Sequence, residues 1–433
     1  MTIYSNTPSS LADIQSVWQT RGQGGDSWLG QLQQQALDVF AQSGFPTTRL
    51  EDWKYTDTRV IAESYPQWLT TQPQASQQEP DLLDIADAIH LAFVDGRYSP
   101  ELSGSKQLPD GIIAGNLTDL AALHPDLLQH KLGSLANNND SGFVAMNTAF
   151  ASDGAALLLP DNCELERPIY LSFFTRTPKI TTQPRLLINL GANSRATVIE
   201  HYSSSAAAII NTVTEIHCGR GSKLTWYKLQ EEHIDAWHTA VQYAHLEQDA
   251  SIQTTQLDIG GGLVRNELRL TLAGRGASAE ATGLFMADAQ RHIDSRIIVE
   301  HAAPDTRSRE RFRSILANRA RGVFNGRILV QRGAQKTSAE LTNRNLLLNH
   351  GAEINTKPEL EIYADDVKCS HGSTTGQLDA ASLFYLLSRG IDTEAARNIL
   401  ITAFAGELLT DISIKALSER TEQALKNLGS GNG

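Results

Sequence analysis

The chain of 433 residues contains little cysteine, and this excludes several classes of protein. Only Cys163, Cys218 and Cys369 occur. They are too few and too widely spaced for a disulfide framework or for a closed zinc site of four thiolates. Any thiol chemistry must therefore depend on one of these residues, or on a site shared with another chain.

The sequence also lacks an excess of positive charge and any long apolar run. Its 37 Lys and Arg residues against 49 Asp and Glu give a net charge of -12, which argues against binding to nucleic acid. No stretch approaches the roughly 20 apolar residues of a membrane-spanning helix, so no membrane partner is expected. The first residues, MTIYSNTPSSLADIQ, have neither a basic start nor an apolar segment, and a cytoplasmic location is therefore expected.

The first third of the chain predicts an N-terminal helical or α+β region over residues 1–150. Its apolar residues recur at steps of three and four, as in an amphipathic helix, at Leu29, Leu32, Ala36, Val39 and Phe40. Gly44 and Pro46 are expected to end this helix. The polar, glutamine-rich stretch at 70–80 predicts a linker or an exposed loop.

From about residue 155 to 364 the sequence alternates with period two, in short runs rich in Val, Ile, Leu and Thr such as RATVIEHYS, SIQTTQLDI and NELRLTL. Turns that contain glycine recur between these runs, near Gly191, Gly221, Gly276, Gly333 and Gly351. The first spacings are roughly 30 residues and the later ones shorter, which indicates an imperfect repeat.

This pattern favours a mainly β fold, with a parallel β-helix core over residues 151–376 and a large β-sandwich as the alternative. A stacked coil is favoured because about 200 residues is long for one sandwich. After Gly376 the period becomes helical, which predicts a C-terminal helical domain over residues 377–433. Gly390 and Gly406 are expected to separate its helices.

Several candidate motifs have a structural explanation that is preferred to a functional one. The glycines at 260–262 and at Gly274 lack the sequence context of a nucleotide site and are expected in turns. His217 and Cys218 are neighbours on a predicted strand, so they face opposite sides and cannot ligate one ion together. Cys163 is expected to be a small buried residue.

Cys369 and His371 are the best candidates for a functional site. Their spacing of two on the strand-like stretch EIYADDVKCSH places both side chains on one face. Thiolate and imidazole are ligands for iron, zinc and copper. Two ligands do not complete a site, so the alternatives are an interface shared with a partner or a free thiol beside a surface imidazole.

Four segments of the sequence resemble the SufB/SufD family of iron–sulfur cluster assembly proteins. They are GFPTTRLEDWKYTD at 44–57, IVEHAAPDTRSRERFRSIL at 298–316, GVFNGRILV at 322–330, and the nearly continuous block at 334–391 that contains DDVKCSHGSTTGQLDAASLFYLLSRGI. The resemblance implies a right-handed parallel β-helix flanked by helical domains, and so favours the solenoid over the sandwich. It also implies that a SufD-type chain pairs with SufB, while each binds the ATPase SufC.

Within that family the sequence is more similar to the SufD branch. Asn343 stands where SufB proteins have a cysteine thought to act in cluster assembly, and DDVKCSHG, with Cys369 and His371, resembles the SufD form. The resemblance implies a scaffold that is not an enzyme, with a transient iron–sulfur cluster built at the SufB interface and none held stably by this chain alone. His371 would be a cluster ligand or a proton carrier, and Cys369 would contribute less.

The same resemblance implies that the C-terminal helices dock SufC, and that the isolated chain can form a homodimer. Two other functions remain open from the residues. One is a carbohydrate-active enzyme, because β-helices also carry polysaccharide lyases and hydrolases. The other is a purely structural partner of the ATPase without any ligand role.

Overall fold

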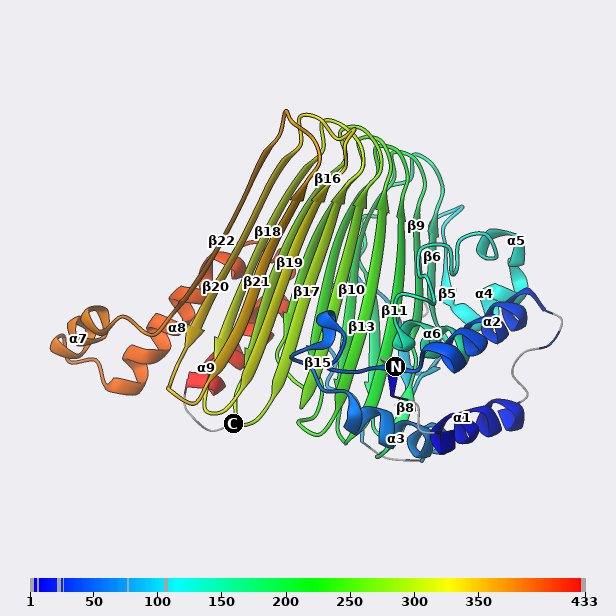
Figure 1. The fold of residues 1–433 in the computed structure, drawn as a ribbon, viewed down its shortest axis with the longest axis horizontal. Coiled ribbons are helices and arrows are strands. Elements are labelled where there is room, and N and C mark those ends of the chain that lie inside the picture. The colour runs from blue at the N-terminus through cyan, green and yellow to red at the C-terminus, as the bar shows by residue number, and fades with distance from the viewer. Residues whose placement is uncertain are drawn as a thin grey trace.

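The structure is a computed structural model that describes residues 4–5, 8–21, 25, 27–75, 78–104 and 108–429. Figure 1 shows long strands stacked side by side into a solenoid, with helices near both ends. The solenoid has about eight turns, and the expected parallel β-helix with flanking helices is confirmed. In the described part of the chain, no helix is both long and apolar enough to cross a membrane.

Two sheets form the solenoid, and successive strands alternate between them. The first sheet contains, in spatial order, β4 (Arg97–Tyr98), β3 (Ile89–Val94), β7 (Ile169–Thr175), β10 (Arg195–Ser204), β12 (Lys223–Glu231), β14 (Ser251–Asp258), β16 (Ser278–Ala287), β18 (Arg307–Leu316), β20 (Ser338–Leu347) and β22 (Lys368–Gly376). The second contains β5 (Ile113–Asn116), β6 (Gly154–Leu159), β9 (Arg185–Leu190), β11 (Ala208–Cys218), β13 (Trp237–Leu246), β15 (Leu263–Leu272), β17 (His292–His301), β19 (Arg321–Val330) and β21 (Glu353–Ile362), with β8 (Ile180–Thr182) beside β11.

Each strand of the repeating coils pairs in parallel with the strand one full turn away. The turn length varies from 26 residues, between Gln242 and Leu268, to 32 residues, between Gly326 and Pro358. The expected shortening of the repeat toward the C-terminus is therefore wrong. Gly333 precedes β20 and Gly351 follows it, so these two glycines belong to different rows of turns and are half a turn apart.

Apolar side chains fill most of the space between the two sheets. Because alternate residues of a strand point to opposite faces, every second residue enters this interior, and Trp226, Leu268 and Ile297 are fully buried there. Parallel sheets buried on the inner face in this way form one continuous core along the solenoid.

The middle turns also bury a network of charged and polar side chains. Lys228 Nζ lies 3.0 Å from His238 Nε2, and His238 Nδ1 lies 2.7 Å from Glu232 Oε1. Glu200 accepts a hydrogen bond of 2.9 Å from the Trp226 indole. Burial lowers the pKa of Lys228 and raises the pKa of Glu200 to about 7, because the interior disfavours the charged forms. Sequence reasoning did not identify this network.

The N-terminal residues form helices and short strands that cover the start of the solenoid. These elements are β1 (Tyr4–Ser5), α1 (Pro8–Arg21), α2 (Trp28–Ser43), β2 (Phe45–Pro46), η1 (Glu51–Trp53), α3 (Arg59–Thr70), α4 (Leu117–Leu123), α5 (Pro125–Leu128) and α6 (Gly142–Phe150). The predicted amphipathic helix is α2, which begins where Ser27 Oγ accepts from the Gly30 N–H and ends before Gly44. Three strands that precede residue 151, β3, β4 and β5, belong to the two large sheets.

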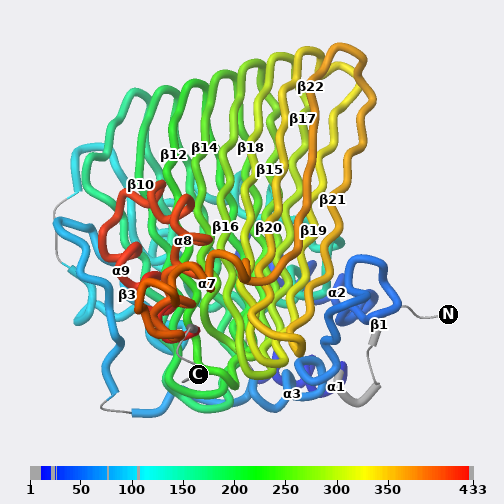
Figure 2. The backbone as a smooth tube through the Cα atoms, turned by 90° about the vertical axis from the view of Figure 1, so that its left-hand side faces the viewer, coloured from blue at the N-terminus to red at the C-terminus, as the bar shows by residue number. Residues whose placement is uncertain are grey.

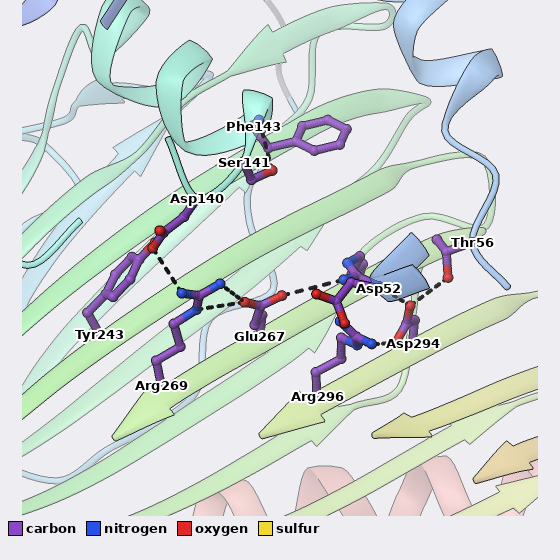
Figure 3. A network of polar contacts seen from close by, with 11 residues as sticks. Asp52, Thr56, Asp140, Ser141, Phe143, Tyr243, Glu267, Arg269, Asp294 and Arg296 are labelled. Atoms are coloured by element: carbon purple, nitrogen blue, oxygen red, sulfur yellow. Dashed lines mark hydrogen bonds and ion pairs between the residues drawn. The ribbon is translucent and has the colours of Figure 1, made fainter. Parts of the chain in front are cut away.

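Residues 51–56, which we call the strap, are fastened to the outer face of the second sheet. The Arg265 guanidinium lies 3.6 Å from the centre of the Trp53 ring, and Asp52 forms an ion pair of 2.9 Å with Arg296. Figure 3 shows this network of carboxylates and guanidinium groups between the strap and the strands. The segment that resembles the family signature at 44–57 therefore joins the N-terminal helices to the solenoid.

The C-terminal helices are α7 (Ala380–Ser388), α8 (Thr393–Leu409) and α9 (Lys415–Gly429). Helices α8 and α9 pack on the outer face of the first sheet (Figure 2), whereas α7 extends away from the solenoid (Figure 1). Gly390 separates α7 from α8 as expected, but the break predicted at Gly406 is wrong. The helix continues through Gly406 because Ala405 and Leu408 are buried against the sheet, and it ends at Leu409.

Candidate functional site

The C-terminal end of the solenoid is open. Among the described residues, strand β22 pairs only with β20 and strand β21 only with β19, so each has one edge without a described neighbour. Figure 1 shows both strands at the end from which α7 departs. Unpaired N–H and C=O groups along such edges can bond to a strand of another chain.

Cys369 and His371 lie on β22, on the side that faces the interior of the last turn. In the sheet Cys369 is beside Ala339 and His371 is beside Leu341, and both β20 residues are buried in the core. Side chains at paired positions of a parallel sheet point the same way, so the two residues share a face as their spacing predicts. No further turn in the described part of the chain covers them, and their side chains lie at the open end.

The two residues differ in their surroundings. Cys369 is half-buried against the core, and burial raises the pKa of its thiol, to which the nearby Glu310 carboxyl on β18 adds repulsion. Burial in turn raises the pKa of Glu310 to about 8. The imidazole of His371 is exposed, and none of the described residues donates a hydrogen bond to it or accepts one from it. His371 is therefore accessible to a group that another chain brings.

The residues at the open end supply only part of a metal site. Among the described residues, no three His, Cys, Asp or Glu side chains come together in a way that could hold a metal ion. Cys369 and His371 offer one sulfur and one nitrogen, whereas iron in protein clusters and tetrahedral zinc take four ligands. Their role as cluster ligands therefore stays a prediction that requires donors from another chain.

Apolar side chains on β21 and directly after it are also incompletely covered at the open end. Ile354 and Leu360 on β21 are only partly buried, and Ile362 and Tyr363 are 40% and 59% exposed. In an inner turn of the solenoid, residues at such positions are covered by the next coil. Apolar surface of this kind beside two free strand edges is typical of a protein interface. We call Ile354, Leu360, Ile362 and Tyr363 the apolar rim. Sequence reasoning missed it, although Ile362 follows the inward alternation of PELEIYADD.

The strap also reaches the open end. Glu51 lies 3.4 Å from Lys357 Nζ on β21, and Lys357 Nζ lies 3.0 Å from Glu359 on the same strand. These charges are exposed, so each pair contributes little stability. They place a residue of the N-terminal signature beside the last strand of the second sheet.

The remaining cysteine and histidine candidates lie away from the open end, on β11 and near the start of the solenoid. Cys218 points into the core, where burial raises the pKa of its thiol to about 12, while the neighbouring His217 points outward toward Ser134. The prediction that these two residues face opposite sides is therefore confirmed. Cys163 is half-buried rather than buried, because it packs at the edge of the core near the start of the solenoid.

Helix α7 forms a second candidate surface. None of its residues is buried, and Phe384 and Tyr385 are 73% and 57% exposed. A short helix with large apolar side chains in water gains stability when it packs against another surface. The α7 surface, defined by Phe384, Tyr385 and Leu387, is therefore available to a partner.

Comparisons with known proteins identify similar sequences over most of the chain. Residues 173–404 match the family described as SUF system FeS cluster assembly, SufBD core domain, and residues 22–171 match the SufBD protein N-terminal region. An iron–sulfur cluster assembly SufBD family protein of Synechocystis is 33% identical over 92% of this chain and 91% of its own length. The iron–sulfur cluster assembly protein SufD of Escherichia coli is 32% identical over the same shares, and SufD of Bacillus subtilis is 23% identical over 91% of this chain and 92% of its own length.

Proposed function

Since the chain belongs to the SufBD family of SUF-system iron–sulfur cluster assembly proteins, we propose that it is the SufD-type scaffold subunit of a cytoplasmic assembly complex. In this proposal it pairs with a SufB-type chain, binds a SufC-type ATPase and catalyses no reaction itself. A nascent cluster is built where the two scaffold chains meet.

The open end of the solenoid is the observation that carries this proposal. It combines two free strand edges, an apolar rim, and the incomplete pair of Cys369 and His371 within one surface. A partner with a matching end would extend both sheets, cover the rim and bring further ligands to the same place. Pairing and completion of the site would then be one event.

His371 has the better chemistry for a direct role. Its exposed imidazole can ligate iron as the neutral base or move a proton near neutral pH. Cys369 is half-buried with a raised thiol pKa, so it is mostly protonated at neutral pH until a metal or a base removes the proton. This difference supports a larger role for His371 than for Cys369.

The α7 surface supports the ATPase-docking part of the proposal. Phe384 and Tyr385 lie on a helix that makes no buried contact, while α8 and α9 are occupied by their packing on the first sheet. Strand β22 leads directly to α7 through residues 377–379. If the ATPase binds to α7 and then moves, the movement would therefore act on the chain close to the open end.

One experiment tests the shared site. The chain is reconstituted with SufB- and SufC-type partners, and iron, labile sulfide and cluster absorbance are measured for the wild type, His371→Ala and Cys369→Ala. His371→Ala should leave the complex assembled and the ATPase active but lower cluster formation at least about tenfold, because alanine can neither bind iron nor carry a proton. Cys369→Ala should have the smaller effect.

The matched control for that experiment is His350→Ala. His350 is an exposed histidine in the turn between β20 and β21, so it removes an imidazole near the same end without touching the proposed site. Cluster formation in His371→Ala at the wild-type rate would contradict the ligand role. A stoichiometric stable cluster on the isolated chain would contradict the shared site.

A second experiment tests the docking of the ATPase. Deletion of residues 379–433 would also uncover the first sheet, because α8 and α9 pack on it, so point substitutions are sharper. Phe384→Ser with Tyr385→Ser should weaken capture of the SufC-type ATPase at least about tenfold, since large apolar residues dominate such interfaces. Val60→Ser, an exposed apolar position on α3, is the control, and unchanged capture by the α7 variant would contradict the proposal.

Family membership favours cluster assembly over the alternative of a carbohydrate-active enzyme. The third function, a structural partner without a ligand role, predicts that His371→Ala and His350→Ala behave alike in the reconstituted complex. The metal and sulfide measurements therefore separate this function from the proposed one.

A further inference from the structure

Two buried asparagines lie directly inside the open end. Asn343 and Asn345 are on β20, 0% and 3% exposed, and both point into the interior of the solenoid next to β22. A buried amide is unfavourable unless its donors and acceptors are bonded. We call this pair the amide clasp.

The Asn343 side chain joins three strands. Its Oδ1 accepts hydrogen bonds from Thr356 Oγ1 on β21 at 2.9 Å and from Ser373 Oγ on β22 at 3.3 Å. Asn345 Nδ2 donates to the same oxygen at 2.7 Å. The Asn343 Nδ2 group donates to the Phe312 carbonyl oxygen on β18 at 3.4 Å. Three of these four bonds therefore converge on one acceptor oxygen.

The Asn345 side chain continues the network along β22. Its Nδ2 also donates to the Thr374 carbonyl oxygen at 3.2 Å and to Thr375 Oγ1 at 3.4 Å, while its Oδ1 accepts from Ser314 Oγ at 2.7 Å. The clasp thus ties Ser373, Thr374 and Thr375 to β20 and β18, and Thr356 ties the clasp to the second sheet. No described strand pairs with the other side of β22, so these bonds provide the restraint that a further strand would give.

The clasp lies between His371 on β22 and helix α7, the two features that the proposed function uses. His371 is two residues before Ser373, and α7 begins at Ala380, a few residues after Thr375. Any displacement of α7 reaches His371 through the segment that the clasp holds. A larger apolar side chain would fill the position of Asn343 without the need for buried bonds, as Phe312 does at the paired position one turn earlier.

We propose that Asn343 and Asn345 are positioning residues for His371, because they hold the second half of β22 in place and so fix where the imidazole lies at the open end. This inference rests on the proposed function of His371. Neither asparagine touches the cluster in this arrangement. Asn343 is then the centre of the restraint, because its Oδ1 accepts three of the bonds.

The acceptor role of Asn343 gives a sharp test. Asn343→Asp keeps the oxygen that accepts three bonds, whereas Asn343→Leu removes it and leaves Thr356 and Ser373 without their acceptor. Hydrogen–deuterium exchange of the β22 amides should be at least about tenfold faster in Asn343→Leu and within about threefold of wild type in Asn343→Asp. Asn355→Leu, at an exposed position on β21, is the matched control and should leave β22 unchanged.

Two more measurements complete the experiment. Ser373→Ala removes one donor at the edge of the fold, where correct folding is not in question, and should speed exchange of the β22 amides about threefold. In the reconstituted complex, Asn343→Leu should lower cluster formation toward the level of His371→Ala, while Asn343→Asp should retain it. Rescue by the aspartate separates a positioning role from a general loss of stability.

The possible failures are distinguishable. Unchanged β22 exchange in both Asn343→Leu and Ser373→Ala, or equal loosening by leucine and aspartate, would overturn the clasp. Loosened β22 with wild-type cluster formation in Asn343→Leu, in a complex where His371→Ala fails, would also overturn the positioning role. Wild-type cluster formation in His371→Ala would instead overturn the proposed function of that residue, and with it the positioning role.

Discussion

The two ends of the solenoid are built from the same kind of turn, but they differ in how the last strands are paired and buried. At the N-terminal end every residue of β6 and β7 is buried, and the sheets close with the antiparallel pairs β5 with β6 and β4 with β3. Helix α6, buried along its whole length, packs on the outer face of the second sheet beside β11. At the C-terminal end, β22 has no fully buried residue and no such cover.

This difference indicates that the described part of the chain closes the solenoid at one end and leaves the last turn exposed at the other. A solenoid turn buries its inner face only against its neighbours, so a terminal turn needs a cap or a partner. The N-terminal residues supply a cap from this chain. The C-terminal helices do not, because α8 and α9 pack on the outer face of the first sheet and α7 extends away.

The largest expected effect is a difference in the free energy of unfolding between two truncated side chains, one well covered and one at the open end. Phe143→Ala, in α6 on the covered side of the solenoid beside β11, removes a ring that packs on Phe45 and Trp53, and should lower the free energy of unfolding by about 3–5 kcal/mol. Ile362→Ala at the open end should cost about 1 kcal/mol or less, because the side chain is already 40% exposed. Urea unfolding of both variants measures the difference. Similar losses would show that the open end is packed as tightly as the covered side.

The second prediction concerns the free energy of unfolding, whose dependence on pH should have opposite signs for a buried group at each end. Burial raises the pKa of Glu310, near the open end, to about 8 from 4.5, so the folded protein holds a proton that the unfolded chain has lost. Its contribution to stability therefore falls as pH rises from about 4.5 to 8, by roughly 4 kcal/mol. Glu310→Gln should remove that part of the decline in unfolding experiments at pH 5 and pH 8.

His90, in β3 at the capped end, gives the opposite sign. Burial lowers its pKa to about 4 from 6.5, so the unfolded chain binds the extra proton between these values. Its contribution to stability is present above pH 6.5 and is lost as pH falls toward 4. His90→Gln should flatten the unfolding profile below pH 6.5 and leave the decline above it. A change above pH 6.5 instead would contradict this assignment.

The smallest expected effect is at His371 itself. Its side chain is exposed and makes no hydrogen bond to a described residue, so His371→Ala should change the free energy of unfolding by less than about 0.5 kcal/mol. Cys369→Ala, which truncates a half-buried side chain, should cost somewhat more, about 1 kcal/mol. Thermal unfolding of the isolated chain compares the two. A large loss in His371→Ala would mean that the imidazole supports the last turn rather than a partner.

The sequence alone was sufficient for the period of the elements and for the face on which each residue lies. Alternation with period two predicted the strands, and it placed Cys369 and His371 on one face and His217 opposite Cys218. The recurring glycine turns indicated a coil of roughly 30 residues. These features are local, because a strand's alternation and a turn's chemistry depend on residues near each other in the chain.

Only the tertiary structure decided which residues meet across turns and at the ends. The turn length varies between 26 and 32 residues, so the sequence does not reveal that Asn343 pairs with Ser373, or that Glu310 lies near Cys369. The break predicted at Gly406 failed for the same kind of reason, since burial of α8 against the sheet outweighs the weak helix preference of one glycine. Pairing and burial depend on residues far apart in the chain. Local patterns give the face of a residue, but stacking of the coils determines its neighbours.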